Sequence, residues 1–278
     1  MSETPTPLPT AADPAGIAIP RLIEQHGDKL FSLALRFCGN RHDAEDLVQE
    51  TFLSAWRNWD SFRGESSPGT WLYTIAARAC QRMQRKPAGA PASVASLDAM
   101  PVEGPVADLA GRDTSGDTPL DAELRREARQ AVESAIATLP DTFRLPLVLK
   151  DLVGLQLKEI AAILGVPEAT VKTRVHRARM TVRAAMETRL PTRDMPAPAF
   201  DRQVCLDLLH AKMEALDRGE VFSLVQARAC DRCSAVFASL DLAKDVCREI
   251  AMDRIPDALR ESLRRPPADA SEAQAPRP

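Results

Sequence analysis

The stretch LKEIAAILGVPEATVKTRVHRAR, residues 157–179, predicts two short helices joined by a tight turn. Gly165 supplies the positive φ that such a turn needs, and Pro167 suits the first turn of a second helix. Val171 and Val175, four positions apart, are expected to face the first helix. The first helix has one apolar face, made of Leu157, Ile160, Ala161 and Leu164. The pattern is typical of a helix-turn-helix.

The second of these helices is strongly basic on one side. From Glu168 to Arg183 it carries five Lys or Arg residues against one acid. A recognition helix in the DNA major groove places its N-terminal side chains on bases and later cations on phosphates. A solvated amphipathic helix could carry the same charges, but the spacing of the turn favours DNA. The side chains expected to face outward are Lys172, Thr173, His176, Arg177 and Arg179. These five and Arg174 are the expected DNA contacts.

Length and composition bound the class of protein. The chain has 278 residues, with 45% hydrophobic and 27% charged, which is ordinary for two or three soluble domains. A net charge of −3 excludes a globally basic coat but allows a local basic face. The sequence has no run of 18 apolar residues and no basic, apolar leader. We therefore expect a cytoplasmic protein whose six cysteines are reduced thiols or metal ligands.

Proline clusters divide the chain into segments, because proline interrupts helices. The two long proline-poor segments have helical periodicity, so the expected fold is all-α. Within the first of them, Gly39-Asn40 predicts a helix end and Thr70 a helix cap. The expected organisation is a disordered leader over 1–19, a helical domain over 20–86, a flexible acidic linker over 87–119, a helical domain over 120–188, a small helical cysteine-containing unit over 199–252 and a disordered tail over 256–278.

Two motifs in order carry a family resemblance. DAEDLVQETFLSAW with TWLYTIA, then LP…FRLPLVLKDLVGLQLKEIAAILGVPEATVKTRVHRAR, resembles the extracytoplasmic-function sigma factors of bacterial RNA polymerase. The resemblance covers about 20–86, the family's region 2, and about 120–186, its region 4. It implies a transcription initiation factor that binds core polymerase and two promoter elements, with no catalysis and no required cofactor. A separate anti-sigma protein is a further candidate partner.

The resemblance also assigns a polymerase-binding helix. The family's clamp-binding helix matches DAEDLVQETFLSAW, which implies docking on the coiled coil of the largest polymerase subunit. An acidic outer face suits a partly basic helical partner, although it is also an ordinary solvated face. The expected contacts are Asp43, Asp46, Leu47, Gln49, Glu50 and Phe52.

The family's promoter-melting helix matches TWLYTIAARACQRMQRK. Cations that track a strand and aromatic rings that stack on bases suit this task, although each Trp taken singly fits a core position better. The loop from Phe62 to Ser67 lies where the family captures bases. The family usually has Asn and Asp near two positions that are Arg here, so its base preference does not carry over. The expected contacts are Trp71, Arg78, Arg82, Arg85 and Lys86.

The C-terminal unit contains a Cys-x-x-Cys pair, Cys230 and Cys233, with Cys205 upstream. Two thiolates at a helix start can bind one tetrahedral metal, with distant ligands completing the site. The pattern resembles the zinc-binding anti-sigma domain, but Gln226 stands where that family has a His. We take His210 as the fourth candidate zinc ligand, with Cys247 as another. A redox-responsive thiol pair and incidental buried cysteines are the alternatives.

Three classes of function compete for this sequence. A sigma factor explains both motifs. A helix-turn-helix regulator acting without polymerase would lack the clamp-helix match over 43–56. A metalloenzyme would need an acid or base beside the cysteines, and the sequence has no HExxH or comparable motif. A fused C-terminal regulator that masks a DNA- or polymerase-binding face is a further hypothesis.

Overall fold

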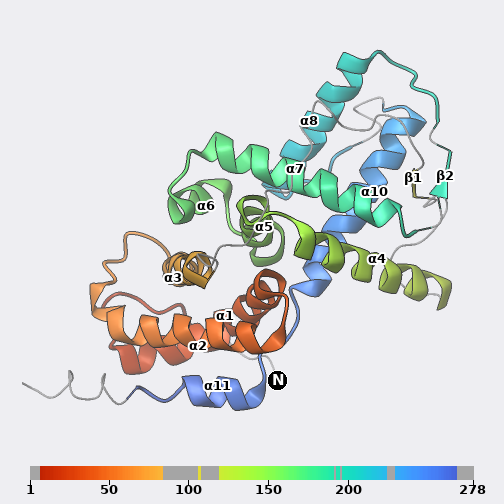
Figure 1. The fold of residues 1–278 in the computed structure, drawn as a ribbon. Coiled ribbons are helices and arrows are strands. Elements are labelled where there is room, and N and C mark those ends of the chain that lie inside the picture. Colours follow the sequence, from red (N-terminus) through yellow and green to blue (C-terminus); the bar gives the residue numbers. More distant parts are fainter. Residues whose placement is uncertain are drawn as a thin grey trace, which may run out of the picture. The chain divides into compact units, whose positions relative to one another are not determined.

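The computed structural model describes residues 7–83, 106–107, 119–190, 192–194, 196–223 and 229–267. These residues are helical apart from loops and one antiparallel pair of two-residue strands, as expected for an all-α chain (Figure 1). The strands β1 (Val106–Ala107) and β2 (Thr192–Arg193) pair Val106 with Arg193. The contacts among the described residues divide them into two compact units. No helix in the described part of the chain is both long and apolar enough to cross a bilayer.

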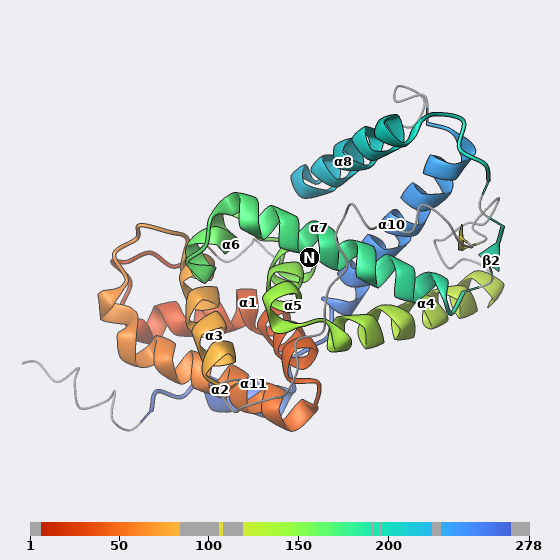
Figure 2. The ribbon, with the colours of Figure 1, turned by 45° about the horizontal axis from the view of Figure 1, so that its top comes forward.

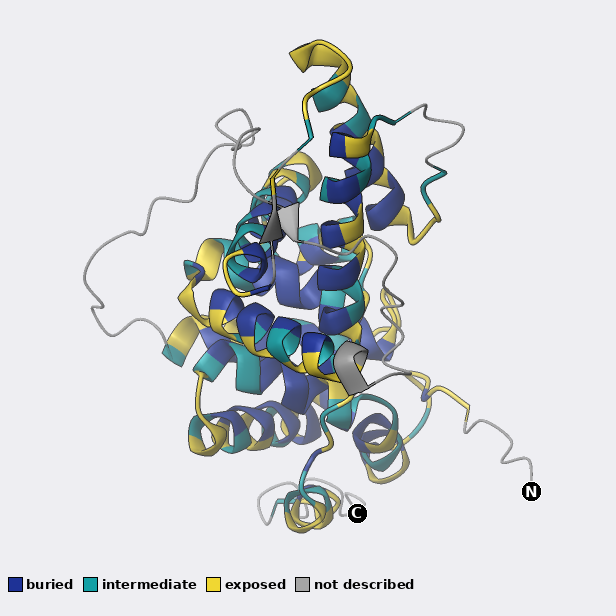
Figure 3. Cartoon of the chain, turned by 90° about the vertical axis from the view of Figure 1, so that its right-hand side faces the viewer, coloured by how far each residue is buried: buried dark blue, intermediate teal, exposed yellow. Residues whose placement is uncertain are grey.

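The first unit is built around three helices, α1 (Ala15–Cys38), α2 (Arg41–Asn58) and α3 (Pro68–Met83). The 3-10 turn η1 (Trp59–Ser61) follows α2. Apolar residues at helical spacing on α1 pack against α2 and α3. Figure 3 shows that burial is concentrated on the inward faces of the helices. Fully buried members of this core are Leu22, Ile23, Leu30, Leu33, Leu47, Phe52 and Leu72.

Two sequence signals set the helix ends in this unit. Gly39 ends α1 with φ 76°, and its N–H donates to the Leu35 carbonyl, so the predicted stop is confirmed. Asn40 then caps α2, because its side chain accepts a hydrogen bond from the Asp43 N–H. The predicted cap at Thr70 is wrong. Ser67 Oγ accepts from the Thr70 N–H at 3.0 Å, because α3 begins three residues earlier than expected.

The two ends of the chain contain more ordered structure than their composition predicted. The predicted disordered leader is wrong from residue 7 onward, because α1 begins at Ala15 and the Trp59 indole donates to the Asp13 carbonyl at 2.7 Å. The predicted disordered tail is wrong over α11 (Asp257–Leu263). This helix packs on α1 and α2, and the Trp56 indole donates to the Leu263 carbonyl at 3.1 Å. Residues 1–6 and 268–278 lie outside the described residues.

The second unit joins two helical groups. α4 (Pro119–Thr138), α5 (Asp141–Leu147), the π-helical segment η3 (Val148–Val153) and α7 (Glu168–Glu187) form the first. The second group is α8 (Arg202–Arg218) and α10 (Asp231–Ile250), which lie next to one another (Figures 1 and 2). α10 packs against α4, η3 and α7. The predicted small C-terminal unit is therefore helical, but its helices share a core with the domain that precedes them.

The predicted linker over 87–119 lies almost entirely outside the described residues. Only β1 and Pro119, the first residue of α4, belong to its described part.

Candidate nucleic-acid interface

The helix-turn-helix pattern forms as its residues predict. α6 (Leu157–Leu164) ends at Gly165, whose φ of 65° lies in the left-handed region. Pro167 then occupies the N-cap position of α7, without a side-chain cap hydrogen bond. Val171 and Val175 are fully buried, as expected for the inward side of the second helix. α7 is 20 residues long, so it extends well beyond the predicted recognition segment.

Four of the predicted DNA-contacting side chains are at least partly accessible. Thr173 is exposed, and its hydroxyl donates to the Ala169 carbonyl at 2.9 Å. Lys172, Arg174 and Arg177 are half-buried. These residues occupy the N-terminal half of α7, which is where a recognition helix meets base edges. The accessible cations are therefore in the right part of the helix for the predicted role.

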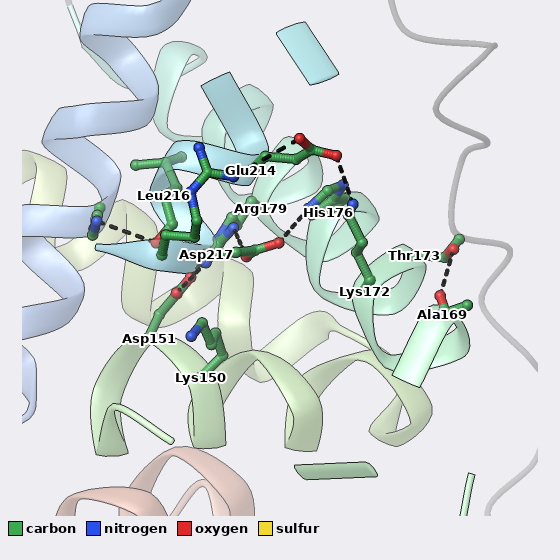
Figure 4. A network of polar contacts seen from close by, with 12 residues as sticks. Lys150, Asp151, Ala169, Lys172, Thr173, His176, Arg179, Glu214, Leu216 and Asp217 are labelled. Carbon is green, nitrogen blue, oxygen red and sulfur yellow. Dashed lines mark hydrogen bonds and ion pairs between the residues drawn. The ribbon is translucent and has the colours of Figure 1, made fainter. Parts of the chain in front are cut away.

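The prediction that His176 and Arg179 face outward is wrong. His176 is 3% exposed and Arg179 is 6% exposed. Both contact Asp217 of α8: His176 Nε2 lies 2.8 Å from one carboxylate oxygen, and Arg179 Nη1 donates to the other at 2.6 Å (Figure 4). The physical reason is the C-terminal unit. Its first helix covers one side of α7, and the sequence of α7 alone gives no sign of that partner.

Arg179 has a second carboxylate partner within the helix-turn-helix domain itself. Its Nε and Nη2 donate to the two oxygens of Asp151 in η3, at 2.9 and 2.6 Å. Burial alone lowers the pKa of the Arg179 guanidinium, but the charges of Asp151 and Asp217 outweigh burial and raise it. A guanidinium held between two carboxylates stays charged and fixed in position. Arg179 is thus part of the domain's internal structure.

Asp217 is a carboxylate kept ionised in a buried position. Burial raises the pKa of this carboxyl, but the hydrogen bond from His176 and the charge of Arg179 together lower it below its ordinary value. One turn earlier on α8, Glu214 accepts a hydrogen bond from Lys172 Nζ at 2.8 Å, and this bond lowers its pKa. Figure 4 shows both carboxylates directed from α8 toward the basic side of α7.

The described contacts predicted on α3 are exposed or half-buried. Arg78 is exposed. Arg82 is also exposed, and it forms an ion pair with Glu50 of α2. Trp71 is half-buried in an aromatic cluster with Trp59 and Phe62, whose ring centroids lie 5.5 Å from it. Arg85 and Lys86 lie outside the described residues.

The predicted base-capturing loop is corrected at its first residue. Phe62 is 7% exposed because it packs on Trp59 and Trp71, so it belongs to the core. The rest of the loop, residues 63–67, is exposed. Gly64 adopts φ 73°, which turns the chain back toward α3.

Two of the predicted polymerase contacts are in the core. Leu47 and Phe52 are fully buried between α2 and its neighbours, so the prediction that they touch a partner is wrong. The reason is the helical period, which puts both on the inward side of α2 with Val48 and Ala55.

The remaining predicted contacts lie on the outer side of α2. Asp43 is half-buried at the start of α2, where its carboxylate accepts a hydrogen bond from the Asn40 side chain. Asp46, Gln49 and Glu50 are exposed. They line a shallow hollow together with Leu53, Ser54, Arg57, Asn58 and Arg82. The hollow on the outer face of α2 is therefore lined mainly by polar and charged side chains.

The C-terminal thiols gather, but they do not assemble the predicted metal site. Cys205 and Cys230 pack around Cys233, which hydrogen bonds to both. Burial, with the neighbouring thiols, raises the pKa of Cys233 to about 12. His210 is exposed on α8. Across the described ranges, no three or more His, Cys, Asp or Glu side chains are arranged to hold a metal ion, so the predicted set does not fit zinc as it stands.

Sequence reasoning missed three carboxylates of this interface: Asp151, Glu214 and Asp217. A signal for two of them was present, because each stands beside apolar residues that the helical period buries, in VLKDLV and in MEALD. A carboxylate at a buried helical position needs a cation. The excess of Lys and Arg in α7 made that helix the expected partner of these carboxylates.

Comparisons with known proteins agree with this geometry. Residues 22–88 match the family model described as Sigma-70 region 2, and residues 129–182 match Sigma-70, region 4. Residues beyond 182 fall outside both matches. The first match takes in most of α1 with α2 and α3, and the second takes in the helix-turn-helix, so the chain carries both of these sigma-factor regions.

Relatives identify the group. ECF RNA polymerase sigma factor SigW of Bacillus subtilis is 35% identical over 165 residues, covering 58% of this chain and 85% of the relative. The ECF RNA polymerase sigma-E factor of Escherichia coli K12 is 36% identical over 161 residues, covering 58% and 82%. The chain belongs to the extracytoplasmic-function RNA polymerase sigma factors. A solved structure of CnrH with the cytosolic domain of CnrY aligns at 25% identity over 64% of this chain and 95% of that chain, with a TM-score of only 0.44, and adds nothing to the assignment.

Proposed function

We propose that this sigma factor docks on core RNA polymerase through the outer face of α2 and contacts promoter DNA through α3 and α7. The observation that carries the proposal is the pairing of two separate surfaces. One is the polar hollow of α2 with Asp46, Gln49 and Glu50 exposed. The other is the basic N-terminal half of α7. A regulator that binds DNA alone has no need of the first surface.

Each surface is assigned a role by its chemistry. The exposed acids of α2 would complement a basic helical partner and fix its orientation. On α3, Arg78 and Arg82 would follow the phosphates of the separating strands, beside the partly accessible ring of Trp71. On α7, Lys172, Arg174 and Arg177 would bind phosphates and Thr173 would approach base edges. Initiation of this kind requires no catalysis by the chain and no cofactor, and it places the chain in the cytoplasm with polymerase.

The test of polymerase docking is a binding titration of fluorescently labelled full chain with core RNA polymerase. Glu50→Lys reverses a charge in the hollow, whereas Asp60→Lys makes the same change at an exposed position in η1. We expect Glu50→Lys to weaken binding by roughly tenfold or more and Asp60→Lys to leave it near wild type, since a reversed charge in an interface costs more than one outside it. Equal binding by both variants would remove α2 from the interface. No binding by any form would refute the proposed function.

A further inference from the structure

The first helix of the C-terminal unit occupies the basic side of the recognition helix. Met180 of α7 is buried in a cluster that α8 and α10 complete. The partners of Met180 in this cluster are Leu209, Met213, Leu216, Cys233, Phe237 and Leu240. Met213 is fully buried, at the middle of α8. An apolar seam of this kind supplies the attraction that holds α8 on the domain.

Next to the seam, two carboxylates of α8 bind side chains that are predicted to contact DNA. Glu214 and Asp217 are three positions apart on α8, so they project from the same side of it. They contact Lys172, His176 and Arg179 at 2.6–2.8 Å. Lys172 and His176 are both predicted DNA contacts. A carboxylate already bound to these side chains must leave before DNA can bind them.

We propose that α8 is a built-in competitor of promoter DNA, which holds the recognition helix in a closed form and leaves it when the factor is active. This inference rests on the proposed function of α7. The competing anion is part of the same chain, so its local concentration is high and the closed form needs no partner.

The contacts make release of α8 feasible. The pair Lys172–Glu214 is exposed by 40% and 47%, so it contributes little to holding the helix. Arg179 keeps both hydrogen bonds to Asp151 when Asp217 leaves, so the buried guanidinium is not stranded without a counter-charge. Asp217 returns to water, where a carboxylate is well solvated. Most of the closing free energy therefore comes from the apolar seam around Met213.

The test uses a variant whose added charge would weaken DNA binding, whereas the proposal predicts that the variant binds DNA more tightly. Met213→Asp in the full chain disrupts the seam, and it adds a negative charge that by itself would weaken DNA binding. Val204→Asp adds the same charge at a 38% exposed position of α8 and is the matched control. The probe is a fluorescein-labelled 30-base-pair duplex of mixed sequence, with binding followed by anisotropy at fixed salt.

If the closed form is about 90% populated, Met213→Asp should bind the duplex roughly tenfold more tightly than wild type, because affinity scales with the competent fraction. Val204→Asp should bind no more tightly than wild type. Asp217→Asn, which preserves shape, should also tighten binding, and it serves if Met213→Asp reduces the helical content. If neither variant binds more tightly than Val204→Asp, the competitor role is refuted.

A parallel titration of the same preparations with core polymerase separates the two claims. Normal core binding with unchanged DNA affinity would refute the competitor and leave the sigma role standing. Tighter DNA binding by Met213→Asp with no core binding by any form would support the competitor and refute docking on polymerase.

Discussion

Arg179 of α7 donates a 2.6 Å hydrogen bond to Asp217 of α8, and both side chains are nearly inaccessible to water, with 6% and 7% exposed. Asp151 binds the opposite side of the same guanidinium. The three residues join the helix-turn-helix domain to the C-terminal extension through one buried ionic cluster.

This cluster predicts a stabilising role for Asp151. Asp151→Ala should lower the free energy of unfolding by about 1.5–3 kcal/mol, because it removes two hydrogen bonds from a buried guanidinium that keeps Asp217 as its counter-charge. Urea denaturation followed by circular dichroism measures the loss. Asp207→Ala, at an exposed position of α8, should change stability by no more than about 0.5 kcal/mol. A loss below about 1 kcal/mol for Asp151→Ala would show that the pair contributes little.

Gly69 predicts a steric requirement at the start of α3. A Cβ atom at this position would lie 2.5 Å from Cε1 of His26, which is packed against Tyr73. Gly69→Ala should therefore destabilise the first unit by about 1–3 kcal/mol through overpacking. Gly16→Ala, in α1 with no heavy atom within 4 Å of the added Cβ, should be neutral or stabilising by up to about 1 kcal/mol. Thermal melts should show a lower melting temperature for Gly69→Ala and no decrease for Gly16→Ala, and equal shifts would contradict the close approach.

His26 predicts a pH dependence of stability. Burial, with a smaller contribution from Lys29, lowers the pKa of His26 to about 4, against an ordinary value of 6.5. Since the folded state binds this proton more weakly than the unfolded state, the full stability is present above pH 6.5. It is lost as the pH falls from 6.5 toward 4.

The expected loss from this residue between pH 7 and pH 5 is about 2 kcal/mol. His26→Leu should reduce the loss of unfolding free energy over that interval by this amount, whatever its stability at pH 7. Urea titrations at both pH values measure the slope. An identical pH dependence in wild type and variant would show that His26 is not buried in its neutral form.

The two sides of α2 predict two different kinds of defect. Leu47→Ala should cost about 2–5 kcal/mol of stability, because it empties a fully buried site. Gln49→Ala, at an exposed site, should leave the melting temperature within about 1 °C of wild type and act only on polymerase binding. A large melting shift for Gln49→Ala, or none for Leu47→Ala, would invert the assignment of inner and outer sides.

The local signals in the sequence predicted most of the fold. Gly39 and Gly165 ended helices as expected, and the spacing of Val171 and Val175 placed them inside, because these features depend on the chain's immediate neighbours. The errors at the two ends of the chain and at the C-terminal unit involve partners distant in sequence. His176 is covered by Asp217, 41 positions away, and Trp56 by Leu263, 207 positions away. The periodicity of the helix that carries His176 or Trp56 does not encode its distant partner.

The sequence predicted which helices carry the candidate site, but it did not predict which of their side chains are buried. A family motif names positions on a helix, and the helical period decides which of them are accessible. Leu47 and Phe52 share the motif with Asp46 and Glu50 but lie on the buried side. Reading the motif and the period together would have separated core from surface.

The most direct test of the central claim is run-off transcription by core RNA polymerase on a pooled library of promoter fragments from the source genome, with the full chain or without it. The account predicts transcripts with defined start sites only when the chain is present. It also predicts that Glu50→Lys reduces them strongly while Asp60→Lys does not. A transcript pattern that is the same with and without the chain, and unchanged after Met213→Asp, would contradict the account.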